Sequence, residues 1–160
     1  MRYVEAPQWG SNCGVSETSV FLAGGISGCP DWQSELVKML DIDGLVVYNP
    51  RRSDFDMSKP NGAHEQIKWE YQHLQRADAI SFWFPKESIC PIVLYELGFH
   101  LNSNKCIFIG IEPGYCRTID VIVQSSLARE NGVSIVHSLQ HLANNIADYR
   151  NCVARMHGKH

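Results

Sequence analysis

Short apolar runs alternate with longer segments of helical periodicity along most of the chain. From residue 19 onward, the runs of strand length cover residues 20–23, 45–48, 79–84, 106–111 and 133–136. The segments with apolar residues at helical spacing cover about residues 32–40, 63–77, 91–102, 118–130 and 139–150. Five successive strand–helix units predict an α/β fold of three layers, in which helices flank a five-stranded parallel sheet.

The residues at the ends of these segments are consistent with a single domain over residues 1–160. Asp31 precedes the first predicted helix as an N-cap, and Gly44 follows that helix, where a left-handed residue is favoured. No internal repeat or interdomain linker interrupts the pattern. Residues 1–18 have weak periodicity, so we expect a flap or an additional edge strand there, and we expect residues 155–160 to fray.

The composition is that of an ordinary globular protein. The 160 residues are 44% hydrophobic and 19% charged, which excludes disordered and low-complexity classes. The formal net charge of −3 provides no positive excess for binding polymeric nucleic acid. No apolar stretch reaches the roughly 20 residues of a membrane helix, and the first residues lack a signal-peptide core. We therefore expect a cytoplasmic protein that does not bind a membrane.

The six cysteines are scattered along the chain. They form no CxxC pair and no cluster with histidine at metal-ligand spacing. The sequence therefore predicts neither a metal site nor a redox pair, and it indicates no cofactor. Buried, reduced thiols are the expected state of these residues.

The residues that follow the strands are the first place to look for chemistry. A parallel sheet of Rossmann-like or flavodoxin-like type binds ligands outside the carboxyl ends of its strands. Here the segments after the strands read GGISG, NPRRSDF, FPKES and IEPGYCR. We expect the site to be built from these segments and from the helices that follow them.

Glu96 stands alone in an apolar environment. It is the only formally charged residue between Glu87 and Lys105, within PIVLYELGF, where burial of an unpartnered carboxylate would cost several kcal/mol. Pro91 marks a helix start nearby, whose dipole is expected to help keep Glu96 ionised. Glu96 is thus a candidate nucleophile or base, the alternative being a boundary glutamate with a structural partner.

Glu70 is a similar exception on the preceding helix. It lies three residues after Ile67 and four before Leu74, on a stripe with Tyr71 and Ala77 that is expected to face the core. Two inward carboxylates on consecutive helices could flank one scissile glycosidic bond. A structural hydrogen bond to a backbone group or to an arginine is the alternative for Glu70 too.

Two further groups are candidates for substrate binding. The first is the glycine-rich turn at Gly24, Gly25 and Ile26, whose backbone N–H groups could meet an anion, although a plain tight turn explains it equally well. The second follows a strand end, where Arg51 and Arg52 could form a fork for phosphate or carboxylate beside Asn49. Surface ion pairs are the alternative for the two arginines.

Three segments, in their order and spacing, resemble the nucleoside 2-deoxyribosyltransferase superfamily. These are FLAGG, WEYQHLQRADAISFWFP and YELG, which together span about residues 21–101. The resemblance implies a five-stranded parallel sheet and a nucleophilic glutamate in the ELG motif, which is Glu96. It also implies a catalytic carboxylate eight residues before Asp78, which is Glu70, where the family more often has aspartate. The isolated carboxylates and the family pattern thus select the same two residues.

Two positions depart from the family pattern. Phe21 stands where many members have a tyrosine that touches the nucleophile, so the resemblance implies that Glu96 is steered in another way. Cys90 stands where enzymes acting on free nucleosides tend to have aspartate and related nucleotide hydrolases tend to have serine. The group at the 5′ end of the substrate therefore stays open. Cys90 itself, or Ser88 two residues earlier, is the candidate for contacting that end.

These observations leave three hypotheses. The first is a transferase that exchanges the base of 2′-deoxyribonucleosides through a glycosyl ester of Glu96, with Glu70 moving the proton of the departing base. The second is a hydrolase that releases the base from a nucleotide or a related N-glycoside. The third is a nucleotide-binding or sensing module without turnover. The expected partners are a nucleoside or nucleotide and a free nucleobase, and the resemblance implies a homo-oligomer whose sites are shared between subunits.

Overall fold

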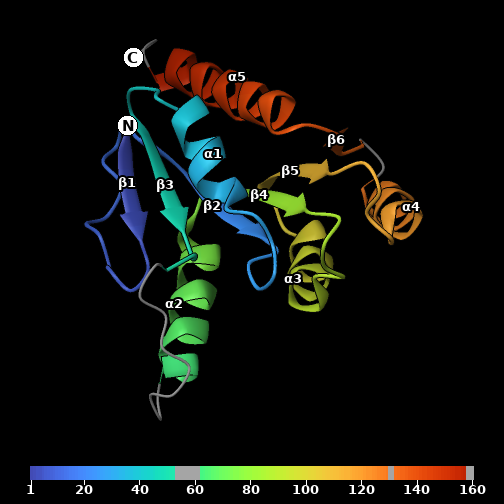
Figure 1. Ribbon diagram of the computed structural model, residues 1–160. Coiled ribbons are helices and arrows are strands. Elements are labelled where there is room, and N and C mark those ends of the chain that lie inside the picture. Colours follow the sequence, from blue (N-terminus) through green and yellow to red (C-terminus); the bar gives the residue numbers. More distant parts are fainter. Residues whose placement is uncertain (53–61, 130–131, 158–160) are drawn as a thin grey trace.

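A computed structural model describes residues 1–52, 62–129 and 132–157 of the chain (Figure 1). These residues form a six-stranded sheet in which every pairing is parallel. Its strands, in spatial order, are β1 (Arg2–Glu5), β3 (Leu45–Asn49), β2 (Thr18–Gly24), β4 (Ala79–Phe84), β5 (Cys106–Ile111) and β6 (Ser134–Val136). The predicted α/β fold with a helix-covered parallel sheet is confirmed, with six strands in place of five.

The sixth strand is β1, which lies at the edge of the sheet. It pairs with β3 so that Val4 lies beside Tyr48, and the Ala6 N–H continues the ladder to the Asn49 carbonyl at 3.0 Å. Of the four residues of β1, only Val4 is buried. The apolar pattern of β1 is therefore too short for periodicity alone to distinguish an edge strand from a flap.

Five helices cover the two faces of the sheet (Figure 1). On one face lie α1 (Trp32–Met39) and α5 (Leu139–His157), and on the other lie α2 (Gly62–Arg76), α3 (Pro91–Leu101) and α4 (Thr118–Ala128).

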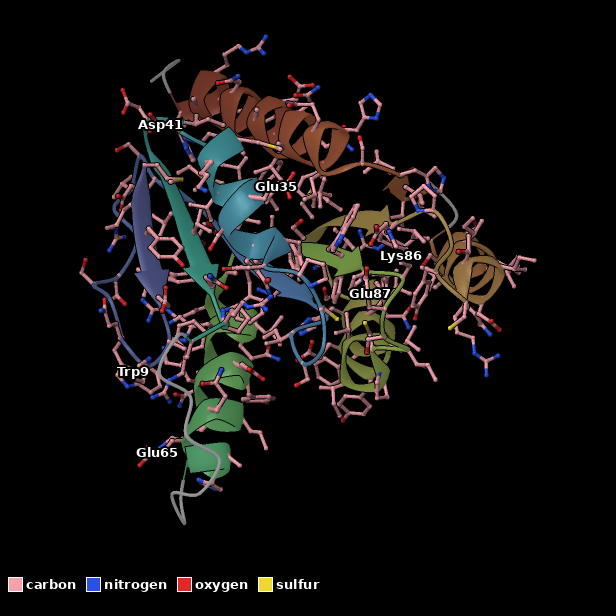
Figure 2. The ribbon with its side chains drawn as sticks, in the orientation of Figure 1. Trp9, Glu35, Asp41, Glu65, Lys86 and Glu87 are labelled. Atoms are coloured by element: carbon pink, nitrogen blue, oxygen red, sulfur yellow. The ribbon has the colours of Figure 1, made fainter. Side chains whose placement is uncertain are left out.

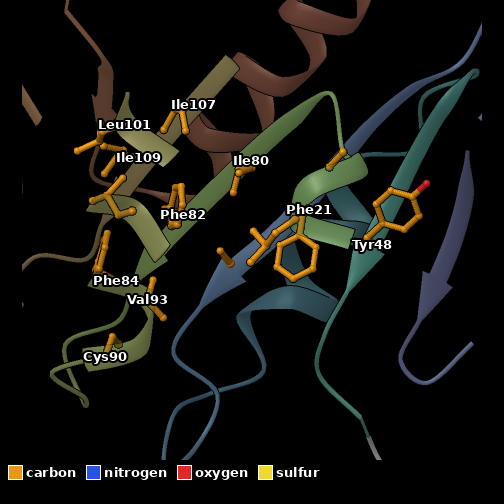
Figure 3. Close-up of a cluster of buried hydrophobic side chains, with 14 of the residues drawn as sticks. Phe21, Tyr48, Ile80, Phe82, Phe84, Cys90, Val93, Leu101, Ile107 and Ile109 are labelled. Carbon is orange, nitrogen blue, oxygen red and sulfur yellow. The ribbon is translucent and has the colours of Figure 1, made fainter. Parts of the chain in front are cut away.

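Alternation along the strands separates two hydrophobic cores. Val20 and Leu22 of β2 pack with α1 and α5, whereas Phe21 and Ala23 pack with α2, α3 and α4. Figure 3 shows part of the second of these cores, where Phe21, Ile80 and Phe82 of the strands and Val93 and Leu101 of α3 belong to one cluster. The sheet is thus buried on both sides, as parallel sheets require.

Several boundaries differ from the predicted ones. α5 continues past residue 150 to His157, three residues into the segment for which we expected fraying, because no glycine or proline interrupts the sequence from Leu139 to His157.

The predicted caps are present: the Asp31 carboxylate accepts a hydrogen bond from the Ser34 N–H at 3.1 Å, and Gly44 has a φ of 73°. No helix among the described residues is long and apolar enough to cross a bilayer.

All six cysteines are free thiols, but they are not uniformly buried. Cys29 and Cys90 are buried, whereas Cys116 and Cys152 are exposed. Cys13 and Cys106 are half-buried. The expectation of buried thiols therefore holds for Cys29 and Cys90 and is wrong for Cys116, in the loop after β5, and for Cys152, on the outer side of α5.

Candidate active site

A cleft of about 370 Å³ lies at the carboxyl ends of β2, β3 and β4. Its walls come from the loop after β2, the start of α3 and the inner side of α2. The lining residues are Phe21, Ala23, Gly24, Gly25, Ile26, Ser27, Pro50, Glu70, Ser88, Cys90, Pro91, Ile92, Val93 and Glu96. Both carboxylates selected from the sequence are among them.

Glu96 lies in the second turn of α3 and is half-buried. Burial, and then the charge of Glu70, raise its pKa to about 8. Among the described residues, none donates a hydrogen bond to the Glu96 carboxyl. The expectation that the helix start keeps Glu96 ionised is wrong for the free protein, because the dipole acts mainly on the first turn and burial outweighs it. At pH 7 its protonated form predominates.

Glu70 reaches the same cleft from α2. Its Oε1 accepts a hydrogen bond of 2.7 Å from Nε2 of Gln66, one turn earlier in the helix. Burial raises the pKa of Glu70, and the Gln66 hydrogen bond opposes that rise by stabilising the ionised form. The two carboxyls thus have different surroundings, because only Glu70 receives a donor from the described residues.

The inward face of α2 is rotated relative to the predicted stripe. Leu74 and, just after the helix, Ala77 are buried as expected, but Trp69 and His73 supply the rest of the inner face. Ile67 and Tyr71 are 65% and 60% exposed. The indole of Trp69 and the imidazole of His73 stack at 3.9 Å and fill the space next to the sheet. Apolar residues on two sides of this helix made its periodicity ambiguous.

The exposed apolar residues Ile67 and Tyr71 line a groove of about 360 Å³ between α2 and α3. Its walls are Ile67, Glu70, Tyr71, Leu74, Gln75, Ile92, Tyr95, Glu96, Phe99 and His100. Glu70, Ile92 and Glu96 line both the groove and the cleft. The two carboxyls therefore lie where the cleft adjoins the α2–α3 groove.

The glycine-rich turn after β2 lies in the cleft, as predicted for Gly24, Gly25 and Ile26. A Cβ on Gly25 would come within 2.7–2.9 Å of Pro85, Cys90 and Cys29. The Trp32 indole N–H donates to the Gly25 carbonyl at 2.8 Å, which fixes the turn. The absence of a side chain at Gly25 is thus a packing requirement of this turn.

Ser88 and Cys90, the candidates for contacting the 5′ end of a substrate, also line the cleft. The Cys90 N–H donates to Ser88 Oγ at 3.2 Å, and Cys90 has a left-handed φ of 53° just before α3. Lys86 and Glu87 lie in the same loop (Figure 2). Lys86 Nζ is paired with Glu112 at 2.6 Å and does not line the cleft.

The three polar candidates at the end of β3 and just after it do not line the cleft. Asn49 is buried, and its Nδ2 donates to the Tyr3 hydroxyl at 2.7 Å. Arg51 donates to the Cys29 and Pro30 carbonyls at 3.0 and 2.8 Å, so it braces the loop that leads to α1. Arg52 is half-buried and is likewise not among the lining residues.

Several other residues that line the cleft could not be singled out as site residues from the sequence. Ser27 belongs to a segment expected to carry chemistry, whereas Ala23, Ile92 and Val93 are apolar and nothing distinguished them from core residues. The segment after β5 stays behind the site: the Tyr115 hydroxyl donates to the Ile89 carbonyl at 2.8 Å and supports the loop before α3.

Comparison with known proteins shows the family of the chain. A family model described as "Nucleoside 2-deoxyribosyltransferase like" matches residues 17–115, which include β2 to β5, Glu70 and Glu96. The chain belongs to this family. A search of curated proteins finds no match.

The family match covers the part of the chain that builds the cleft. β1, α4, β6 and α5 lie outside the matched residues. Among solved structures, a conserved protein from Enterococcus faecalis V583 is similar over 83% of this chain and 99% of its own, with 11% identity and a TM-score of 0.63. That similarity supports the fold, and the family match supports a nucleoside 2-deoxyribosyltransferase-like protein.

Proposed function

We propose that the protein exchanges the base of a 2′-deoxyribonucleoside through a covalent glycosyl ester on Glu96. The observation that carries this proposal is the meeting of Glu70 and Glu96, from two different helices, in one cleft at the carboxyl ends of the strands. A module that only bound a nucleotide would have no need of two half-buried carboxyls beside an apolar groove.

The surroundings of the carboxyls favour an uncharged nucleoside over a nucleotide. The cleft volume falls within the range of about 300–1,000 Å³ that is usual for small-molecule sites. Among the described residues, no lysine or arginine lines the cleft, so no cation is placed to neutralise a 5′-phosphate. Hydroxyls of Ser27 and Ser88 and the backbone of the Gly24–Gly25 turn are available to bind sugar hydroxyls.

In the first half-reaction, the carboxyl pair shares one proton. Ionised Glu96 attacks C1′ of the nucleoside, the C1′–N bond breaks, and its electron pair leaves with the base. Protonated Glu70 gives its proton to the departing nitrogen, so the base leaves neutral and Glu70 becomes ionised. The sugar stays attached to Glu96 as an ester.

In the second half-reaction, the nitrogen of an incoming base attacks C1′ and the ester bond breaks. Its electron pair returns to Glu96 as a carboxylate, and Glu70 takes the proton that the incoming base loses. Each displacement inverts C1′, so the configuration is retained overall. Attack by water at this stage would make the same chemistry a hydrolysis.

The deciding experiment is incubation with deoxyinosine or thymidine, with and without a free acceptor base, followed by chromatography. Formation of the new nucleoside only when the acceptor is present supports the proposal. Release of free base at the same rate without acceptor would instead establish a hydrolase. No reaction with any nucleoside, although calorimetry detects binding, would leave the binding module as the function. Glu96→Gln is the control for contaminating activity.

We further propose that a second copy of the chain covers the α2–α3 groove. The exposed fractions of its apolar side chains are 65% for Ile67, 60% for Tyr71, 64% for Ile92, 73% for Tyr95 and 57% for Phe99. At about 150–250 Å² for a whole aromatic residue, the patch amounts to on the order of 600 Å² of apolar surface, near the upper end for a monomer.

The size and chemistry of this patch fit self-association. A stable interface buries about 800 Å² on each partner, which the patch and its rim together can supply. Among the described groove residues only Glu70 and Glu96 are acidic and none is lysine or arginine, so most of the groove offers apolar contact and few charges for an ion pair with a partner. Because the groove opens onto Glu70 and Glu96, the second copy would also close that wall of the site.

Sedimentation of Tyr95→Glu tests this interface. The wild-type chain is expected to be at least dimeric at micromolar concentration, and Tyr95→Glu monomeric. Met156→Glu, on α5 at the opposite face of the sheet and 64% exposed, is the matched control that keeps the wild-type mass. A monomeric wild type, or an oligomer that survives Tyr95→Glu, would contradict the proposed interface.

A further inference from the structure

Gln66 connects Glu70 to the loop that follows β3. Its Nε2 lies 2.7 Å from Oε1 of Glu70 and 2.8 Å from the Pro50 carbonyl oxygen. Pro50 lines the cleft, whereas Gln66 does not. The side-chain amide of Gln66 is therefore behind the site and touches it only through Glu70 and Pro50.

The Pro50 carbonyl determines which end of the amide faces Glu70. A backbone carbonyl oxygen only accepts hydrogen bonds, so the Gln66 group next to it must be the NH₂. Turning the amide over would bring its oxygen against the Pro50 oxygen and remove both bonds. The two protons of this NH₂ are thus directed to Pro50 and to Glu70. The Gln66 Oε1 is buried, with no hydrogen-bond partner among the described residues.

This orientation has a consequence for Glu70. An oxygen that accepts from an N–H donor is better satisfied as carboxylate, and a protonated Glu70 must carry its hydrogen on the other oxygen, Oε2. Glu96 has no comparable donor among the described residues. The remaining titratable groups around the pair are Cys90 in the cleft and Tyr71, Tyr95 and His100 in the groove. None of them forms a hydrogen bond with either carboxyl in the described structure.

We propose that Gln66 is a positioning residue that holds Glu70 as the hydrogen-bond acceptor of the pair and thereby places the shared proton on Glu96 in the resting protein. This inference rests on the proposed function. It adds a first step to the reaction: Glu70 takes the proton from Glu96 before Glu96 attacks C1′, and then passes the same proton to the departing base. The proton count is unchanged, because one proton moves from Glu96 to Glu70 to the base.

Carboxyl titration by NMR tests this assignment without substrate. With ¹³C-labelled glutamate, and with Glu70→Gln and Glu96→Gln to identify the signals, Glu70 of the wild type is expected to titrate at lower pH than Glu96. Gln66→Met keeps the length of the side chain but removes both N–H donors. Gln66→Met should therefore lower, by about tenfold, the ratio of molecules that carry the shared proton on Glu96 to those that carry it on Glu70. Gln124→Met, the same change at an exposed position of α4, should leave both titrations unchanged.

The pH dependence of turnover provides the second readout. In Gln66→Met the acidic limb of kcat/KM should move to higher pH, while a merely structural role would lower kcat/KM equally at every pH. The inference is overturned if wild-type Glu96 titrates below Glu70, an outcome that does not depend on the folding of any Gln66 variant. It is also overturned if folded Gln66→Met shifts neither carboxyl. Because the titration needs no turnover, it stands even if no glycosyl transfer is found.

Discussion

At the scale of single residues, the proposed reaction depends on the acidity of two carboxyl groups. Spacing along the chain selected Glu96 and Glu70, because each is a charge among apolar neighbours, and both line the cleft. Their order of ionisation could not be predicted in this way. It depends on the contact of Gln66 with Pro50, sixteen residues apart, and on the burial that outweighs the helix dipole at Glu96. The place of Arg51 outside the cleft lining has a related reason, since the sequence does not reveal that the Cys29 and Pro30 carbonyls lie within its reach.

The raised pKa of Glu96 predicts a pH-dependent cost in stability. The folded state holds this proton up to about pH 8, whereas the unfolded chain loses it near pH 4.5. The contribution of Glu96 is therefore most favourable below pH 4.5 and is lost as pH rises through 8, by on the order of 5 kcal/mol. Glu96→Gln should remove that loss, so its free energy of unfolding should exceed that of the wild type at pH 9 but not at pH 4. Denaturant titrations at the two pH values measure this.

A matched variant separates this effect from a general change of charge. Glu65→Gln, at an exposed position in the first turn of α2 (Figure 2), should give the same difference from wild type at both pH values. Equal stabilisation by Glu96→Gln at pH 4 and pH 9 would show that the Glu96 carboxyl is not protonated in the folded protein.

Trapping the ester tests the role of Glu96 directly. A 2-fluoro-2-deoxy nucleoside slows resolution of a glycosyl ester, so mass spectrometry of a digest should find the sugar on the peptide that contains Glu96. Glu96→Ala should retain the fold and lower turnover by more than about 1,000-fold. Sugar attached to Glu70 or to another carboxylate, or an active Glu96→Ala, would refute Glu96 as the nucleophile.

At the level of elements, the periodicity of the chain predicted the five helices and five of the six strands found among the described residues. The rotated face of α2 shows the limit of this approach. Apolar residues at Ile67 and Tyr71 fit a core stripe as well as Trp69 and His73 do, and only packing against the sheet distinguishes them. Ile67 and Tyr71 line the groove instead of the core. The position of α2 along the chain was therefore predicted correctly, but the side of the helix that faces the sheet was not.

The turn after β2 is predicted to tolerate no side chain at Gly25. From the sequence we expect Gly25→Val to weaken ligand binding more than folding. In the structure, however, a Cβ at Gly25 would crowd Pro85, Cys90 and Cys29. Gly25→Ala should therefore also destabilise the fold, by about 1–3 kcal/mol. Gly98→Ala in α3 is the control, because nothing lies within 4 Å of its Cβ and alanine favours helix by up to about 1 kcal/mol. Urea unfolding should show opposite signs for the two variants. A neutral Gly25→Ala would mean that the turn yields.

In the whole molecule, the strand order explains why the cleft lies where it does. From β2 the chain moves to β3 on one side through α1, and from β3 it crosses to β4 on the other side through α2. The chain order therefore reverses between β2 and β4, where Gly24 lies beside Trp83 at the carboxyl ends of the strands. A ligand site is expected at such a switch point. The following helices, α2 and α3, then bring Glu70 and Glu96 to it.

The groove gives the whole molecule a further predicted property, a dependence of activity on assembly. If a second copy closes the groove, separated subunits would leave Glu70 and Glu96 open to water, which weakens the electrostatic interactions on which proton transfer depends. Transfer activity per subunit should therefore fall when the wild type is diluted below its dissociation constant. Tyr95→Glu should show the low value at every concentration, and Met156→Glu should follow the wild-type curve. Activity per subunit that stays constant while sedimentation shows complete dissociation would mean that each chain holds a complete site.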